Sequence, residues 1–125
     1  MIAALLLALT VQSAPIDWTA NRPTLDWTLV SVGTSTMGFM KPGPSPRLKW
    51  LRSELREPNE FGIMSQISLV EYDCVAGRQR PLQHTSFTGP NMTGTTEGSA
   101  SGEAPWRYAT PGSVGETQFN WACGR

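Results

Sequence analysis

The stretch ISLVEYDCVAGRQR, Ile67–Arg80, decides the fold of this chain. It is rich in β-branched and aromatic residues, which favours a strand over residues 65–75. Ile67 and Leu69 share one face of that strand, whereas the apolar residues from Val70 onward share the other. This switch of face predicts either a β-bulge near Leu69–Val70 or a strand that is covered on both sides.

The stretch continues into a turn at Gly77, and residues 78–88 are expected to return as the neighbouring strand. It also carries Cys74, one of only two cysteines; the other, Cys123, follows 49 positions later. If the two are bonded, a central strand is tied to the last element of the chain. Closing a loop of that length would stabilise the fold by about 4 kcal/mol in the chain-entropy model.

Residues 1–11, MIAALLLALTV, form an apolar run without charged side chains. The run is shorter than the roughly 20 residues of a membrane-spanning helix and is followed by small residues, which is typical of a signal peptide. We expect cleavage after Ser13, an extended leader over residues 14–25, and one domain over residues 26–125. Cysteine is absent from the cleavage point, so no lipid anchor is expected, and an exported chain of 112 residues permits a disulfide.

The charges of the chain cancel, because it has ten basic and ten acidic side chains. A general electrostatic attraction to nucleic acid or to anionic lipid is therefore not expected. Five basic residues, against one acidic residue, do gather between Lys41 and Arg56.

The remaining chain reads as short strands and turns. Residues 27–32 and 35–40 are expected to form a hairpin. Residues 41–46 contain three prolines and are expected to be a loop, and residues 92–96 a short strand. Residues 97–105 are rich in Gly, Ser and Ala and are expected to be a mobile loop.

Residues 47–57 are ambiguous. Leu48, Leu51 and Leu55 recur at a helical spacing among good helix formers, so periodicity favours a helix over a strand. At the C-terminus, Ser113 and Glu116 match a capping box, which predicts a helix over residues 114–122. Several short strands followed by one late helix predict an α+β fold, with an antiparallel sheet of about five to six strands and the helix packed on one face.

Catalytic and metal motifs are weak. His84 is a lone histidine without a metal-binding pattern around it, and Ser113 is better explained as a helix cap than as a nucleophile. Glu71 and Asp73 share one face of a strand; pairing of Asp73 with Arg78 or Arg80, or with a neighbouring loop, is the simpler role. No cofactor is expected. Asn91-Met92-Thr93 is a formal N-glycosylation acceptor.

The best candidate for a binding surface is Lys49, Trp50 and Arg52, because Trp and Arg dominate interface energetics. The alternative without a binding role is a solvated face with Trp50 turned into the core.

Several short motifs, in order, resemble the surface-adhesin protein E family of small exported Gram-negative proteins. They are a strand opening at Trp27, "KWLR" around Trp50, "VEYDC" at residues 70–74, "W…PGS" at residues 106–113, and the closing "CG" at residues 123–124. The resemblance implies an antiparallel sheet with one C-terminal helix, a Cys74–Cys123 disulfide, and a strand rather than a helix over residues 47–55.

The resemblance also implies a function: a non-enzymatic exported protein, periplasmic or secreted, that binds an extracellular or envelope protein or another envelope ligand. The alternative is a small periplasmic enzyme or ligand-binding domain that uses Glu71, Asp73 and the Arg78/Arg80 pair. The sequence does not indicate the oligomeric state.

Overall fold

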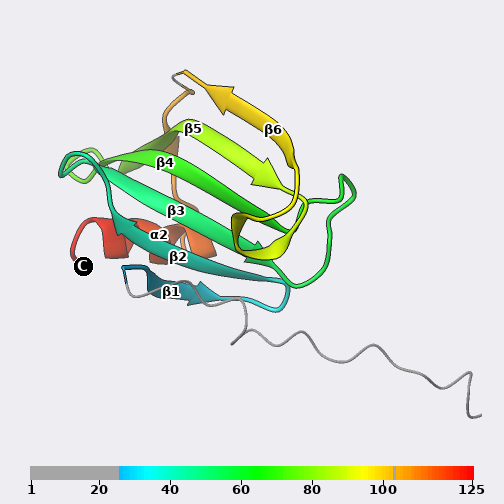
Figure 1. The fold of residues 1–125 in the computed structure, drawn as a ribbon. Helices are drawn as coiled ribbons and strands as arrows, with labels where there is room; N and C mark the ends of the chain where they lie inside the picture. The colour runs from blue at the N-terminus through cyan, green and yellow to red at the C-terminus, as the bar shows by residue number, and fades with distance from the viewer. Residues whose placement is uncertain (1–25, 103) are drawn as a thin grey trace, which may run out of the picture.

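The computed structural model describes residues 26–102 and 104–125, so the expected signal peptide and leader lie outside the described residues. Seven strands form one antiparallel sheet, followed by a C-terminal helix (Figure 1). The elements are β1 Thr28–Val32, β2 Thr36–Pro42, β3 Leu48–Leu55, β4 Ser65–Asp73, β5 Arg78–Phe87, the short 3-10 helix η1 Pro90–Met92, β6 Thr96–Ser101, β7 Arg107–Tyr108 and α2 Val114–Ala122.

The strands lie in the order β1-β2-β3-β4-β5-β6, so each strand pairs with its neighbour in sequence. The short β7 pairs with the start of β5. The stretch Ile67–Arg80 therefore lies in β4, the turn after it and the start of β5, with two strands or more on either side of β4. The β4–β5 register does shift between Leu69 and Val70, but the extra residue is Leu82 of β5; β4 itself pairs with β3 without a break, so its apolar residues lie on both faces of a regular strand.

One face of the sheet carries α2. Phe119 of α2 packs with Met40, Val70 and Tyr72 in the core, and the rings of Tyr72 and Phe119 lie 6.0 Å apart. Burial raises the pKa of the Tyr72 hydroxyl. Gly38 permits close approach of the helix, because a Cβ there would lie 2.8 Å from Nε2 of Gln118.

The helix begins where the capping box predicts. The Ser113 hydroxyl accepts a hydrogen bond from the Glu116 amide at 3.2 Å, and Oε1 of Glu116 accepts from the Gly112 amide rather than from that of Ser113. The Cys74–Cys123 disulfide is confirmed and joins the residue after β4 to the residue after α2. Among the described residues, no helix is long and apolar enough to cross a membrane.

Three expectations from local sequence are wrong. The helical periodicity of residues 47–57 is overturned by β3, whose backbone pairs with β2 and β4 along its length. The loop expected over residues 41–46 begins later, since β2 extends to Pro42, which pairs with Lys49 at the end of the hairpin. Residues 97–105 were expected to be a loop, and 92–96 a short strand, but the strand there is β6, over Thr96–Ser101.

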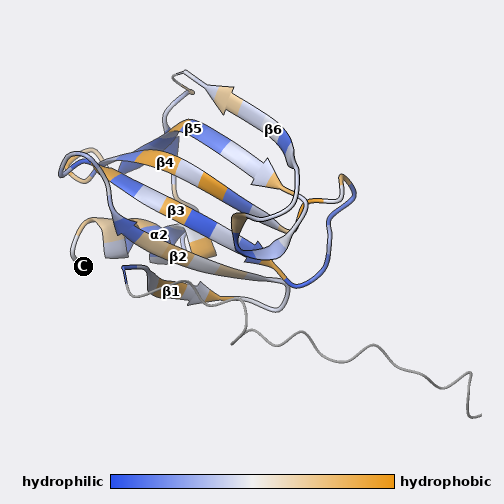
Figure 2. Ribbon diagram, in the orientation of Figure 1, coloured by the Kyte–Doolittle hydropathy of each residue, from blue (hydrophilic) through white to orange (hydrophobic). Residues whose placement is uncertain are grey.

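These differences have a common physical cause. In β3, hydropathy does not alternate simply, because apolar and charged residues share each face: Leu48 and Trp50 lie on the same face as Arg52. Figure 2 shows hydrophobic and hydrophilic positions interspersed along β3. In β6 every residue is exposed, so no buried face marks it as a strand; its pairing with β5 decides its conformation. Backbone pairing thus overrides local propensity at both positions.

Candidate functional site

The three residues expected to form a binding surface lie on both faces of β3. Lys49 pairs with Val70, which belongs to the core beneath the helix, so Lys49 lies on the helix-bearing face. Trp50 and Arg52 each lie an odd number of positions from Val70's partner and therefore on the opposite face. We call this the open face because α2 does not cover it, although its end at Phe39 and Arg52 is buried. The structure brings Trp50 and Arg52 to one face and separates Lys49 from Trp50.

Lys49 is further engaged by its own hairpin, because its Nζ donates a hydrogen bond to the Pro46 carbonyl at 3.0 Å. Its side chain lies along the loop that joins β2 to β3.

Arg52 is buried within the open face, and only 3% of the residue is exposed. Its Nε donates to Oε2 of Glu54 at 2.7 Å, and its Nη2 donates to Oδ1 of Asn91. The rings of Trp27 and Phe39 each lie 5.9 Å from the guanidinium carbon. Arg52 therefore supports the sheet from inside and presents little surface to a partner.

The loop at η1 is fastened to the same buried group. The backbone N–H of Asn91 donates to Oε1 of Glu54 at 2.9 Å, and the backbone N–H of Met92 donates to the Ser65 hydroxyl at 2.9 Å. Both Asn91 and Met92 have positive φ, at 57° and 60°, which L-residues seldom adopt. Because the Asn91 side chain is engaged with Arg52, the formal glycosylation acceptor at residues 91–93 is poorly placed for modification.

Trp50 remains as the aromatic residue at the middle of the open face. It is half-buried and pairs across the sheet with Lys41 of β2 on one side and Leu69 of β4 on the other. Lys41 forms an ion pair with Asp26 at 3.2 Å and lies 4.7 Å from the centre of the Trp27 ring. A row of aromatic, basic and apolar side chains thus crosses this face.

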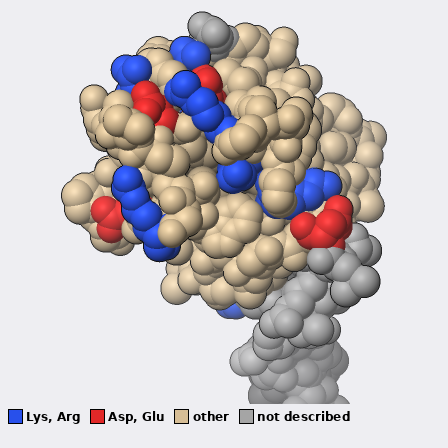
Figure 3. Space-filling view, turned by 90° about the vertical axis from the view of Figure 1, so that its left-hand side faces the viewer, with Lys and Arg blue, Asp and Glu red and all other residues tan. Residues whose placement is uncertain are grey.

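The carboxylates considered for catalysis belong to a ladder of ion pairs at the hairpin end of the sheet. Glu71 accepts from Arg80 Nε at 2.8 Å, and Asp73 accepts from Arg78 Nε at 3.2 Å. Arg47 reaches both carboxylates, at 3.7 and 3.9 Å. We call these five residues the arginine ladder. Figure 3, which views the molecule from this end, shows basic and acidic side chains intermixed.

The pKa of Asp73 is lowered mainly by the hydrogen bond from the Ala76 amide, and further by Arg78 and Arg47. The sequence predicts that Asp73 bonds a neighbouring loop or pairs with Arg78 or Arg80; in the structure it accepts from the Ala76 amide and pairs with Arg78, whereas Arg80 pairs with Glu71. A carboxylate held in its charged form in this way is suited to structure rather than to proton donation near neutral pH.

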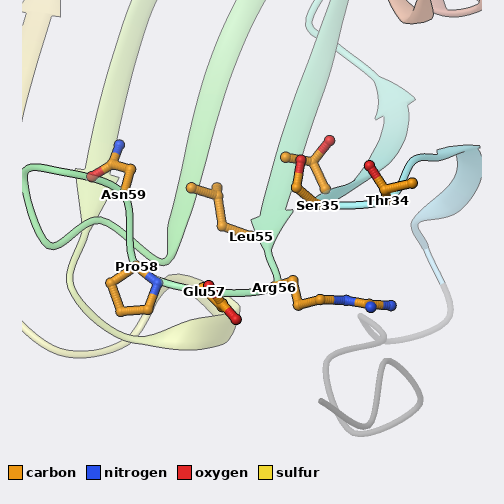
Figure 4. A pocket seen from close by; sticks show the side chains of 8 residues that line it. Thr34, Ser35, Leu55, Arg56, Glu57, Pro58 and Asn59 are labelled. Carbon is orange, nitrogen blue, oxygen red and sulfur yellow. The ribbon is translucent and has the colours of Figure 1, made fainter. Parts of the chain in front are cut away.

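Hollows lie elsewhere on the surface of the described residues. One, of about 450 Å³, lies at the opposite end of the sheet, where Leu55 sits between Ser35 and Asn59 (Figure 4). Neither this hollow nor two smaller ones are lined by Glu71, Asp73, Arg78 or Arg80. Within residues 26–102 and 104–125, no three His, Cys, Asp or Glu side chains gather as a metal site would require.

Sequence reasoning missed two contributors to these surfaces. Trp106 covers the arginine ladder, with the guanidinium carbons of Arg78 and Arg80 at 4.4 and 4.1 Å from its ring centre. Lys41 reaches Trp27 and Asp26. No local pattern in the sequence signals either contact, because each joins segments that are well separated along the chain.

Comparison with known proteins gives one match. The family model described as surface-adhesin protein E matches residues 38–124, which include β3, β4, both cysteines and α2. No curated protein and no solved structure gives a significant match to the chain.

Proposed function

Because the chain belongs to the surface-adhesin protein E family, we propose that it is a non-enzymatic exported protein that binds a protein or cell-envelope ligand through the open face of its sheet. Family membership suggests a surface-adhesin role and leaves the ligand unspecified. Together with the disulfide, it also suggests an extracytoplasmic location, because disulfides persist in oxidising compartments. The signal peptide over residues 1–13, and a periplasmic or secreted destination, belong to this proposal.

The observation that carries the proposal is the position of Trp50. It lies on the face opposite the helix, beside Lys41 and Leu69, and it is only partly buried. Tryptophan is among the residues that contribute most to binding when a partner covers them, since it buries a large area at a low cost in conformational entropy.

Arg52 supports this surface from within the same face, two residues beyond Trp50. Its bonds to Glu54 and Asn91 tie the η1 loop to β3. A face held in place in this way loses little conformational freedom when a ligand binds. We therefore assign Trp50 as the contact residue and Arg52 as a positioning residue, and we do not include Lys49 in the contact surface.

The test is a binding assay of the purified mature protein against immobilised extracellular-matrix proteins, serum proteins and envelope fractions. For any component that binds, Trp50→Ala is expected to weaken affinity at least about tenfold. Lys49→Ala is the matched control, because it changes the adjacent residue on the other face, and its affinity is expected to stay within about twofold. Circular dichroism and thermal unfolding establish that each variant is folded.

The proposal fails if Trp50→Ala binds as well as the wild type, or if Lys49→Ala weakens binding as strongly. The second result would place the contact surface on the helix-bearing face or at the β2–β3 loop.

A further inference from the structure

In the arginine ladder, two hydrogen bonds from arginine to carboxylate are donated by Nε. Arg80 donates to Glu71, and Arg78 donates to Asp73. A guanidinium has five N–H donors in a planar fork, so the bond of Arg78 to Asp73 through Nε leaves the terminal amino groups of Arg78 outside that bond. In Arg78, whose side chain is 37% exposed, part of the fork is accessible to solvent.

Arg47 is the loosest member of the ladder. It lies at 3.7 and 3.9 Å from its two carboxylates, which is beyond hydrogen-bonding distance, and its side chain is 57% exposed. Its donors are therefore oriented toward the ladder by charge and are not consumed by short hydrogen bonds to it.

The ladder is also pre-organised. Trp106 lies against the guanidinium groups of both Arg78 and Arg80, and cation–π contact of this kind limits the movement of the arginine side chains. With three arginines and two carboxylates, the five residues carry a net charge of about +1.

We propose that the arginine ladder binds a sulfate ester of a sulfated glycan chain, with Arg47 and Arg78 as the direct contacts. Planar guanidinium groups match tetrahedral oxyanions through paired N–H donors. A sulfate ester carries a single negative charge, which the single surplus charge of the ladder neutralises. A phosphate monoester carries about −1.5 to −2 at neutral pH and would remain only partly compensated.

This site shares no residue with the Trp50 surface, so either assignment can fail while the other stands. It adds a glycan to the ligands of the proposed binding protein, and it needs no general basic surface, which this neutral chain lacks.

The experiment measures binding of the folded protein to immobilised heparin fragments of defined length, with desulfated heparin and vesicles containing phosphorylated lipid as parallel surfaces. We expect binding to heparin that weakens as salt is raised, and much weaker binding to the other two surfaces. Arg47→Ala and Arg78→Ala are each expected to weaken heparin binding about tenfold, since each removes a charge-assisted contact.

Two further variants separate binding from folding and from net charge. Arg56→Ala removes the same charge at the far end of β3 and is expected to change affinity less than about twofold. Arg47→Lys keeps the charge without the planar fork and is expected to bind more weakly than the wild type, even if Arg47→Ala does not fold.

The Glu71→Gln variant tests the direction in which heparin affinity changes. It preserves the shape of the side chain and removes one negative charge from the ladder, so heparin binding is expected to become several-fold tighter. A purely structural ladder gives no reason for affinity to rise. The proposal is overturned if Glu71→Gln does not tighten binding, if Arg47→Ala and Arg56→Ala are equivalent, or if desulfated heparin or phosphorylated vesicles bind as well as heparin.

Discussion

Replacing Arg52 with methionine tests whether this arginine supports the sheet. In the wild type the Arg52 and Glu54 side chains are 4% and 0% exposed, and Glu54 accepts hydrogen bonds from Arg52 and from the Asn91 amide. Removing Arg52 would leave the Glu54 carboxylate buried without its counter-ion, and would also remove a bond to the Asn91 side chain. We expect Arg52→Met to lower the free energy of unfolding by about 3–5 kcal/mol.

Urea denaturation followed by tryptophan fluorescence measures the loss, provided that the slope against denaturant stays constant. Glu54→Gln alone is expected to lower the free energy of unfolding by a similar amount. The double variant is expected to lose at least about 1 kcal/mol less than the sum of the two single losses, because neither variant's remaining charge is then left unpaired. Arg56→Met, at an exposed position on the same chain segment, is expected to change stability by less than about 0.5 kcal/mol. A loss of unfolding free energy below about 1 kcal/mol for Arg52→Met would refute the argument that Arg52 supports the sheet, and Arg52 would again be a candidate contact residue.

Three other predictions concern the frame around the site. Replacing Cys74 and Cys123 together with serine is expected to lower the free energy of unfolding by about 4 kcal/mol in urea, and the unreduced, denatured wild type should contain no titratable thiol. The lowered pKa of Asp73 contributes stability that is present above its ordinary value of 3.8 and is lost as the pH falls below it; Asp73→Asn should make the acid side of the stability profile shallower. Met92→Gly should be more stable than Met92→Ala by about 1 kcal/mol in thermal or urea unfolding, since both lose the side chain and only glycine relieves the positive φ. Equal stabilities of those two variants, an unchanged acid limb for Asp73→Asn, or two free thiols would each contradict the corresponding argument.

The parts of the fold that local chemistry determines were predictable. The capping box places the start of α2 at Val114, and the apolar residues of Ile67–Cys74 place β4 inside the sheet, where it pairs with β3 and β5. The strand at residues 48–55 was predicted by family resemblance and not by periodicity, because Arg52 and Glu54 occupy buried positions where apolar residues would normally reveal a strand.

The surfaces were less predictable than the fold. Sequence adjacency grouped Lys49 with Trp50, yet consecutive residues in a strand point to opposite faces, so adjacency would have suited only a loop. Conversely, Trp106 meets Arg78 and Arg80 from a segment more than 25 residues away. Contacts of that kind depend on how β5 and the following chain pass one another, which a single sequence does not specify.

The order of the strands bears on how the chain folds as it emerges. Each of β2 to β6 pairs with the strand made just before it, so successive hairpins can form without waiting for distant segments. The later elements are different, since β7 returns to β5 and α2 contacts β1 at the other end of the sequence. Cys123 follows all of the strands in sequence, so β4 and its neighbours can already be paired when Cys123 becomes available. Oxidation would then join segments of a sheet that is already assembled. The disulfide therefore stabilises the completed fold and has little opportunity to trap a wrong arrangement.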